Sequence, residues 1–191
     1  MKATRKDGRL VPFDECYIYS TLAAAGPLYS KGDTNTLYFD NLPDISDKKS
    51  AKYNDETGIG RGAPFKVYAN SENRMITCEC HFFVQQASGP QSASAIKNTL
   101  RWLEAHVYPQ QAGTGTYIPP PILQIKCFNN IADDTLCVVL NNYNVKFDPA
   151  VPWDETEGIP YKLDVSLDFE VVYQSSDLPY AEDIVRNGGT Q

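Results

Sequence analysis

Positive charge is scarce and scattered in this sequence. The 191 residues contain 17 Lys and Arg against 24 Asp and Glu, which gives a net charge of −7 at pH 7. Proteins that read nucleic-acid sequence carry a basic stripe or patch, and no segment of this chain has one. The composition therefore argues against sequence-specific nucleic-acid binding. An acidic protein can still serve near DNA, because it repels the polymer in a channel.

Side chains for acid–base and nucleophilic catalysis are also few. The only histidines are His81 and His106. Neither lies in a nucleophile-elbow pattern, and a serine or cysteine mechanism would have to use one of them. Both are expected to be hydrogen-bonded histidines at the surface or in an interface.

Two loops offer only weak catalytic signals. Residues 58–62 are glycine-rich but lack the Gly-Lys-Ser/Thr ending of a phosphate-binding loop, and Pro64 follows them. Asp154 and Glu157 could form a hydrolytic carboxylate pair, but acids in such a loop are more commonly solvated, and the EF-hand spacing is absent. The sequence predicts no enzymatic activity and no cofactor.

The cysteine pattern favours neither disulfides nor zinc. Five cysteines are an odd number, and their spacings match no disulfide framework, which favours a reducing compartment. Cys78 and Cys80 alternate with Ile76 and Phe82, so they are expected to face the core rather than bind metal. The cysteines are Cys16, Cys78, Cys80, Cys127 and Cys137.

Long hydrophobic runs are missing as well. The longest apolar stretch near the N-terminus, residues 17–25, is broken by Ser20 and Thr21. It is too short and too polar for a membrane-spanning helix, and it lacks the features of a signal peptide. The sequence therefore predicts no membrane association.

The residues that are abundant indicate a β-rich protein with many turns. The chain has 12 Tyr, 13 Pro and 12 Gly. Polar residues 44–62 show little periodicity and are expected to form a long, partner-bound loop, while Asn70, Ser71 and Asn73 indicate a turn. The expected strands cover residues 37–39, 65–68, 75–84, 122–128, 136–147 and 161–173.

One amphipathic helix is predicted. Ile96, Leu100, Leu103 and Val107 form a single apolar stripe. Its start is compatible with a cap near residues 88–91, at Ser92 or at Ser94, and Tyr108-Pro109 ends it. With no internal repeats, the chain is expected to be one largely antiparallel β domain with this helix packed on the sheet.

Strand periodicity is strongest in residues 161–173. Odd positions are apolar, while most even positions are polar or charged, as in a half-buried strand. Such a strand would span roughly 40 Å, which suits a sheet continuing into neighbouring subunits. Its charged face is either a solvated surface or a channel wall. The charged residues of this face are Lys162, Asp164, Asp168 and Glu170.

The order of motifs over residues 37–175 resembles the hub and tube-initiator proteins of contractile phage-tail baseplates. The shared features are turns, prolines and strand ends in a fixed order. They are Asn41-Leu42-Pro43, residues 46–53, residues 60–64, residues 70–76, residues 100–109, residues 119–122, residues 145–149 and Gly158-Ile159-Pro160. Residues 127–130 depart from the pattern, which has a glycine there, and no LysM-like segment is present.

The resemblance implies an antiparallel β-sandwich or split barrel of tail-tube type, with one flanking helix and a long C-terminal β-hairpin at 136–173. Residues 1–36 would be an N-terminal extension and 176–191 a tail. Six copies would form a ring in which the hairpins build one inner barrel. Lys162, Asp164, Asp168 and Glu170 would line its channel. Contacts between subunits are expected at Lys48, Lys49, Tyr53, Arg61 and Trp153.

The function implied is structural. The ring would initiate or cap the tail tube in the virion, after assembly in the host cytoplasm, and would contact other baseplate and tube proteins. DNA would pass through it without specific binding. Two alternatives stay open: a baseplate-associated peptidoglycan hydrolase, and a glycan-binding β-sandwich suggested by the tyrosines and Trp153.

Overall fold

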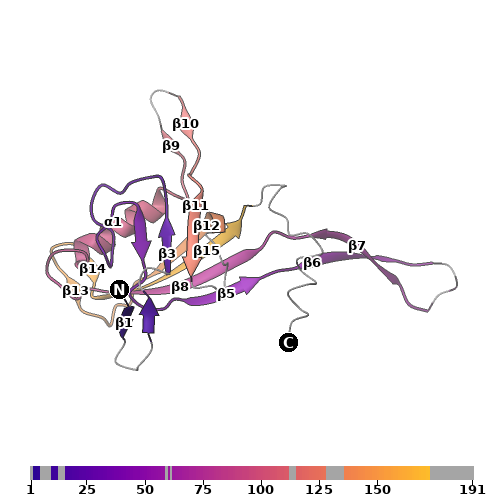
Figure 1. Cartoon of the computed structure of the whole chain (residues 1–191), viewed down its shortest axis with the longest axis horizontal. Helices are drawn as coiled ribbons and strands as arrows, with labels where there is room; N and C mark the ends of the chain where they lie inside the picture. Colours follow the sequence, from indigo (N-terminus) through magenta and orange to yellow (C-terminus); the bar gives the residue numbers. More distant parts are fainter. Residues whose placement is uncertain are drawn as a thin grey trace.

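A seven-stranded antiparallel sheet forms the body of the protein (Figure 1). The structure, a computed structural model, describes residues 2–4, 10–12, 16–58, 60, 62–111, 115–127 and 136–172. The strand order is β4-β3-β11-β12-β15-β8-β5. The strands are β3 (Cys16–Tyr19), β4 (Thr36–Tyr38), β5 (Asp44–Lys48), β8 (Met75–Phe83), β11 (Leu123–Cys127), β12 (Leu136–Lys146) and β15 (Lys162–Val171). The prediction of a mainly β, antiparallel fold with one helix is confirmed.

Helix α1 (Ala93–Glu104) covers the apolar face of the sheet. Ile96 and Leu103 are fully buried against strand residues such as Val165, as the predicted stripe requires. Ser92 is the N-cap, because its side chain accepts a hydrogen bond from the Ala95 amide. The helix ends at Glu104, earlier than the Tyr108-Pro109 stop predicts.

Strand β15 lies in the interior of the sheet. Its predicted alternation is confirmed, since Leu163, Val165, Leu167, Phe169 and Val171 are all buried. The strand pairs with β12 on one side and with β8 on the other. The expectation that β15 needs a neighbouring subunit to complete its hydrogen bonds is therefore wrong, because alternation reveals a buried face but not which strands supply the partners.

A long two-stranded arm extends from the edge of the body (Figure 1). It consists of β6 (Ala51–Glu56) and β7 (Phe65–Ser71), which pair antiparallel. Each strand continues the line of a sheet strand, β5 or β8, and the Glu72 amide donates to the Ser50 carbonyl between them. The name arm is used below for β6 and β7.

The arm overturns two predictions. Residues 44–62 contain two strands rather than one long loop, and residues 70–73 do not reverse the chain, because β7 runs through Ser71 and β8 starts at Met75. Every residue of β6 and β7 is exposed. A ribbon without a buried face has no reason to alternate apolar and polar residues, so its strands leave little periodicity in the sequence.

Short two-stranded ribbons complete the described structure. Strand β3 is part of the main sheet, although it lies within the predicted N-terminal extension, and residues 176–191 lie outside the described part. The ribbons are β1 (Lys2–Thr4) with β2 (Leu10–Pro12), β9 (Gln110–Gln111) with β10 (Tyr117–Ile118), and β13 (Trp153–Asp154) with β14 (Ile159–Pro160).

A disulfide joins β3 to β11. Cys16 and Cys127 face each other in the ladder, and their sulfur atoms are 2.16 Å apart. The expectation that the cysteines stay unpaired is thus wrong, because the two partners are 111 residues apart and only the strand pairing brings them together. Cys78 and Cys80 are buried free thiols, as their alternation predicts.

Candidate functional site

The predicted channel-lining residues share one face of the sheet, on the side opposite α1, which is called the polar face below. Lys162, Asp164, Asp168 and Glu170 are all half-buried. The ladders place His81 and Lys146 beside Asp164, and Thr77 and Asn142 beside Asp168. Period-2 spacing on a single strand is enough to predict that the four residues share a face, but these cross-strand neighbours depend on the register.

The charge of Asp164 is balanced within the same chain. Its carboxylate contacts Nδ1 of His81 at 2.6 Å and the Lys162 ammonium at 3.3 Å. Partial burial acts to raise the pKa of Asp164, but the hydrogen bonds from His81 and Lys162 outweigh it and the pKa lies below its usual value. Asp164 is therefore ionised, and its ion pair with Lys162 offsets part of the negative charge.

The other two acids, Asp168 and Glu170, accept hydrogen bonds from neutral side chains. Thr77 and Asn142 donate to Asp168 at 2.8 and 3.3 Å. Glu170 accepts from Asn141 and Asn73, and these hydrogen bonds lower the pKa of Glu170. Because these donors are neutral, two carboxylates are held in place without neutralisation. The part of the polar face that repels anions lies at Asp168 and Glu170, not at Asp164.

A shallow hollow of about 300 Å³ lies on the polar face at the Asp164 end. Carboxylates, an ammonium, an imidazole and an amide surround it, so its lining has both signs of charge. Within the described residues, no group of three or more His, Cys, Asp or Glu side chains is placed to hold a metal ion. The polar lining residues are Glu79, His81, Asn144, Lys146, Asp164 and Ser166.

Three of the predicted contact residues belong to the β5–β6 strand line that leads into the arm. Lys48 is the last residue of β5, Lys49 follows it, and Tyr53 lies in β6. Lys49 forms an ion pair with Asp47 at 3.4 Å. Arg61 lies outside the described residues.

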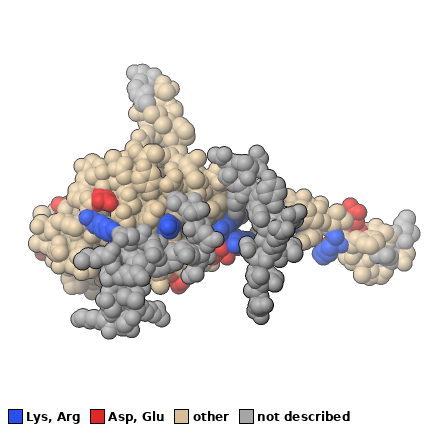
Figure 2. Space-filling model, viewed as in Figure 1, with Lys and Arg blue, Asp and Glu red and all other residues tan. Residues whose placement is uncertain are grey.

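The arm exposes large apolar side chains on both of its faces. Tyr53 and Tyr68 oppose each other on one face with ring centroids 5.8 Å apart, while Phe65 and Val67 lie on the other. These four side chains are 42–55% exposed. Charged groups accompany them, including the ion pair of Lys66 with Asp55 (Figure 2).

Anchoring at the base of the arm is ionic. Arg74 donates two hydrogen bonds to Asp47, from Nε to Oδ1 and from Nη2 to Oδ2, each 2.8 Å long. The bidentate hydrogen bond from Arg74 is the main cause of the lowered pKa of Asp47. The pair ties β5 to the segment between β7 and β8, so the arm leaves the body on a fixed base.

Trp153 lies in β13, at the end of the body away from the arm (Figure 1). Its ring stacks on that of Phe147, with centroids 5.8 Å apart and an angle of 20° between the planes. The structure therefore does not bring Trp153 together with Lys48, Lys49 and Tyr53. A contact through Trp153 would be a separate surface.

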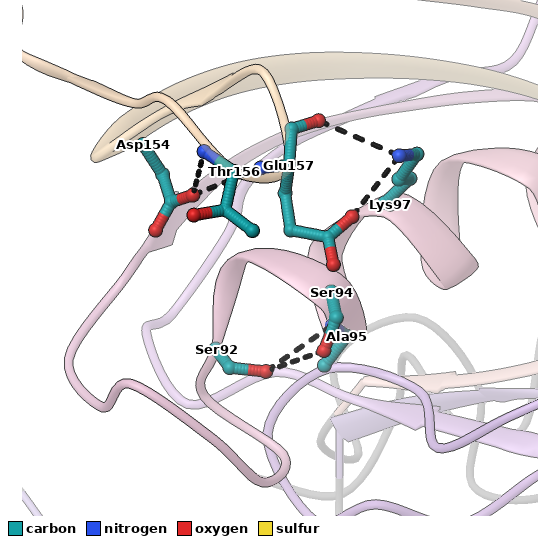
Figure 3. A network of polar contacts seen from close by, with 7 residues as sticks. All are labelled: Ser92, Ser94, Ala95, Lys97, Asp154, Thr156 and Glu157. Atoms are coloured by element: carbon teal, nitrogen blue, oxygen red, sulfur yellow. Dashed lines mark hydrogen bonds and ion pairs between the residues drawn. The ribbon is translucent and has the colours of Figure 1, made fainter.

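The acids near Trp153 have structural roles (Figure 3). Asp154 accepts hydrogen bonds from the amides of Thr156 and Glu157 and so fixes its own turn. The Glu157 carboxylate binds the Lys97 ammonium of α1 at 3.0 Å. Both carboxylates thus hold the β13–β14 turn and dock it on the helix.

A buried serine–histidine pair was not foreseen from the sequence. Nδ1 of His106 is 2.7 Å from the Trp102 carbonyl, and Nε2 is 2.6 Å from the Ser20 hydroxyl. A carbonyl only accepts, so Nδ1 carries the proton and Nε2 accepts from Ser20. Both residues are at most 1% exposed, so no substrate reaches them. Burial lowers the pKa of His106 and keeps the ring neutral.

In the part of the chain that the structure describes, the two edges of the sheet are strands β4 and β5, and each has one neighbouring strand. The described residues contain no helix that is both long and apolar enough to cross a membrane. Comparisons with the profiles of known protein families and with curated proteins gave no match.

Proposed function

We propose that this chain is a structural subunit of a phage tail baseplate. Copies of it assemble into a ring that initiates or caps the tail tube and surrounds the DNA channel, and the protein performs no reaction. The proposal includes a tail-tube type of fold with the polar face of β12 and β15 toward the channel. The order of motifs over residues 37–175 supports the assignment to this family, and the arm gives the main structural support for assembly.

The arm is the observation that carries the proposal. A two-stranded ribbon in water is marginally stable at best, because it buries little surface. Here a ribbon of six and seven residues projects from the body with four large apolar side chains in solvent. Exposed apolar surface of this kind marks a site of protein association. If the arm packs against a neighbouring copy, that contact would bury these side chains.

The sheet edges provide a second means of association. Among the described residues, no strand pairs with the outer edge of β4 or of β5, and such edges pair readily with another chain. Contact of one copy's β4 edge with the next copy's β5 edge is heterologous, and a heterologous contact whose rotation closes produces a ring. The sheet would then run around the ring without a break.

Removing the aromatic pair of the arm tests the proposal. Tyr53→Ser with Tyr68→Ser should abolish ring formation while the body stays folded, because neither side chain belongs to the core. Native mass spectrometry measures the assembly state, and circular dichroism confirms the fold. Tyr161→Ser is the matched control, since Tyr161 is an exposed tyrosine outside the arm. A ring that survives the double substitution would contradict the role given to the arm.

The polar face has its own test. Replacing Asp168 and Glu170 with Lys reverses the charge at the two uncompensated carboxylates, and it should produce particles that eject DNA more slowly, because cations attract the phosphate backbone. The Asp164→Asn variant is the control and should have a smaller effect, since Lys162 already offsets that charge. Equal ejection rates for the Lys variant and the parent would contradict the proposal that the polar face lines the channel.

A further inference from the structure

A small hollow lies beside the last turns of α1, next to the connection between β3 and β4 and the start of β9. It is called the α1 hollow below, and its volume is about 210 Å³. Trp102 and three consecutive alanines, residues 23–25, form much of its apolar lining, while Asn98, Arg101 and Gln110 supply polar groups. Pockets that enclose a whole small molecule usually measure roughly 300–1,000 Å³. The α1 hollow therefore has room for one residue-sized group.

The fold holds two parts of the lining in place. The indole N–H of Trp102 donates to the Leu22 carbonyl at 2.8 Å and so joins the helix to the β3–β4 connection. Asn98 packs directly against Gly26, because a Cβ on Gly26 would lie 2.6 Å from the side-chain nitrogen of Asn98. The absence of a side chain at Gly26 is thus what allows Asn98 its position. A lining fixed in this way needs little reordering when a ligand binds.

The polar groups of the α1 hollow are not used inside the described part of the chain. Neither a hydrogen bond nor an ion pair joins the side chains of Asn98, Arg101 or Gln110 to another described residue. Each of these side chains can donate hydrogen bonds, and Arg101 alone among the lining residues is charged. A guanidinium with amide donors beside it matches a carboxylate.

The only acid of α1 does not interfere. Glu104 is not among the residues that line the hollow. It acts instead on Tyr143 of β12, where burial first and then the charge of Glu104 raise the pKa of the phenol. The charge at the hollow is therefore that of Arg101.

The lining calls for a carboxylate at Arg101 and an apolar group against Trp102. An internal Asp or Glu of a partner ends in its carboxylate and has no apolar group branching beside it. A free amino acid has both groups, but its ammonium would be repelled by Arg101. The C-terminal residue of a polypeptide has both groups on one Cα and an amide in place of the ammonium, and capture of a terminal carboxylate is a recurring mode of peptide recognition.

We propose that the α1 hollow binds the C-terminal residue of a partner polypeptide, with its α-carboxylate at Arg101 and its apolar side chain against Trp102. The site is separate from the proposed ring contacts, because none of its lining residues belongs to the arm or to the edge strands β4 and β5. Binding there and ring formation can therefore fail independently of each other.

A fluorescence titration with two peptides tests the proposal. The chain has two tryptophans, so Trp153→Phe leaves Trp102 as the reporter in the wall of the hollow. The probes are N-acetylated Gly-Ser-Gly-Ser-Leu with a free carboxylate and the same peptide with a C-terminal amide. The free acid should change the Trp102 emission saturably. The amide should bind roughly tenfold more weakly or less, because it lacks the charge-assisted hydrogen bonds to Arg101.

Two variants in the Trp153→Phe background locate the site. Arg101→Gln should remove the preference for the free acid, and circular dichroism should show an intact fold because Arg101 is exposed. Lys52→Gln, which removes an exposed cation of the arm, is the matched control and should keep the preference. Four results would each overturn the proposal: no saturable change with the free acid, equal affinity for acid and amide, a preference that survives Arg101→Gln, or benzoate binding as tightly as the peptide acid.

Discussion

Reduction of the Cys16–Cys127 disulfide should weaken the fold substantially. The bond closes a loop of 111 residues and so restricts the unfolded chain. In the chain-entropy description, a loop of that length corresponds to about 5 kcal/mol of stability. Within the described residues, β3 and β4 join the rest of the sheet through the ladder between β3 and β11, and the disulfide reinforces that ladder. Its loss should therefore loosen this edge first.

Urea denaturation followed by circular dichroism measures the effect. With a slope of about 2 kcal/mol/M, a loss of that size lowers the midpoint by about 2.5 M in reductant. The Cys16→Ala and Cys127→Ala double variant should unfold at the lower midpoint with or without reductant. Cys137→Ser is the control, because Cys137 is an exposed free thiol and its midpoint should depend on reductant as the parent's does.

Two results would refute this reasoning. One is a midpoint that does not respond to reductant. The other is a thiol titration of the denatured, unreduced protein that finds all five cysteines free instead of three. Either result would show that the strands pair at this position without a covalent bond.

Further predictions concern the core, the buried histidine and the helix cap. Val165→Asp should prevent folding in a soluble expression assay, because it buries an unpaired carboxylate and costs several kcal/mol. Stability should fall as the pH drops from about 7 to about 5, because the unfolded chain binds a proton near pH 6.5 that buried His106 resists. His106→Gln should flatten this dependence in urea melts. Ser92→Ala should cost about 1 kcal/mol by loss of the cap to Ala95 in the same melts.

Local patterns in the sequence predict those elements that bury one side. The patterns that predict β15 and α1 are the alternation in residues 161–173 and the apolar stripe that contains Ile96. Both arise because one side of each element must be buried in the core. The arm has no buried side, so β6 was predicted as a loop and the strands of residues 65–84 were separated by a turn. The strand predicted at residues 65–68 does coincide with the first part of β7, but its continuation through Ser71 and its pairing with β6 leave no mark in the pattern.

The candidate site, too, could be predicted from the sequence only in part. The shared face of Lys162, Asp164, Asp168 and Glu170 follows from their spacing alone. The pairing of Asp164 with His81 follows from the β8–β15 register, which the sequence does not specify. That register changes the chemistry, because it leaves Asp168 and Glu170 as the uncompensated charges. The Cys16–Cys127 and Ser20–His106 contacts also join distant segments and need the topology.

The mass and shape of the purified 191-residue chain test the central claim most directly. Native mass spectrometry with electron microscopy of the same sample should show closed rings with a central hole, at the multiple of the 21.3 kDa chain mass that corresponds to six copies. A protein that stays at 21.3 kDa at every concentration, with the arm's tyrosines still open to solvent, would contradict it.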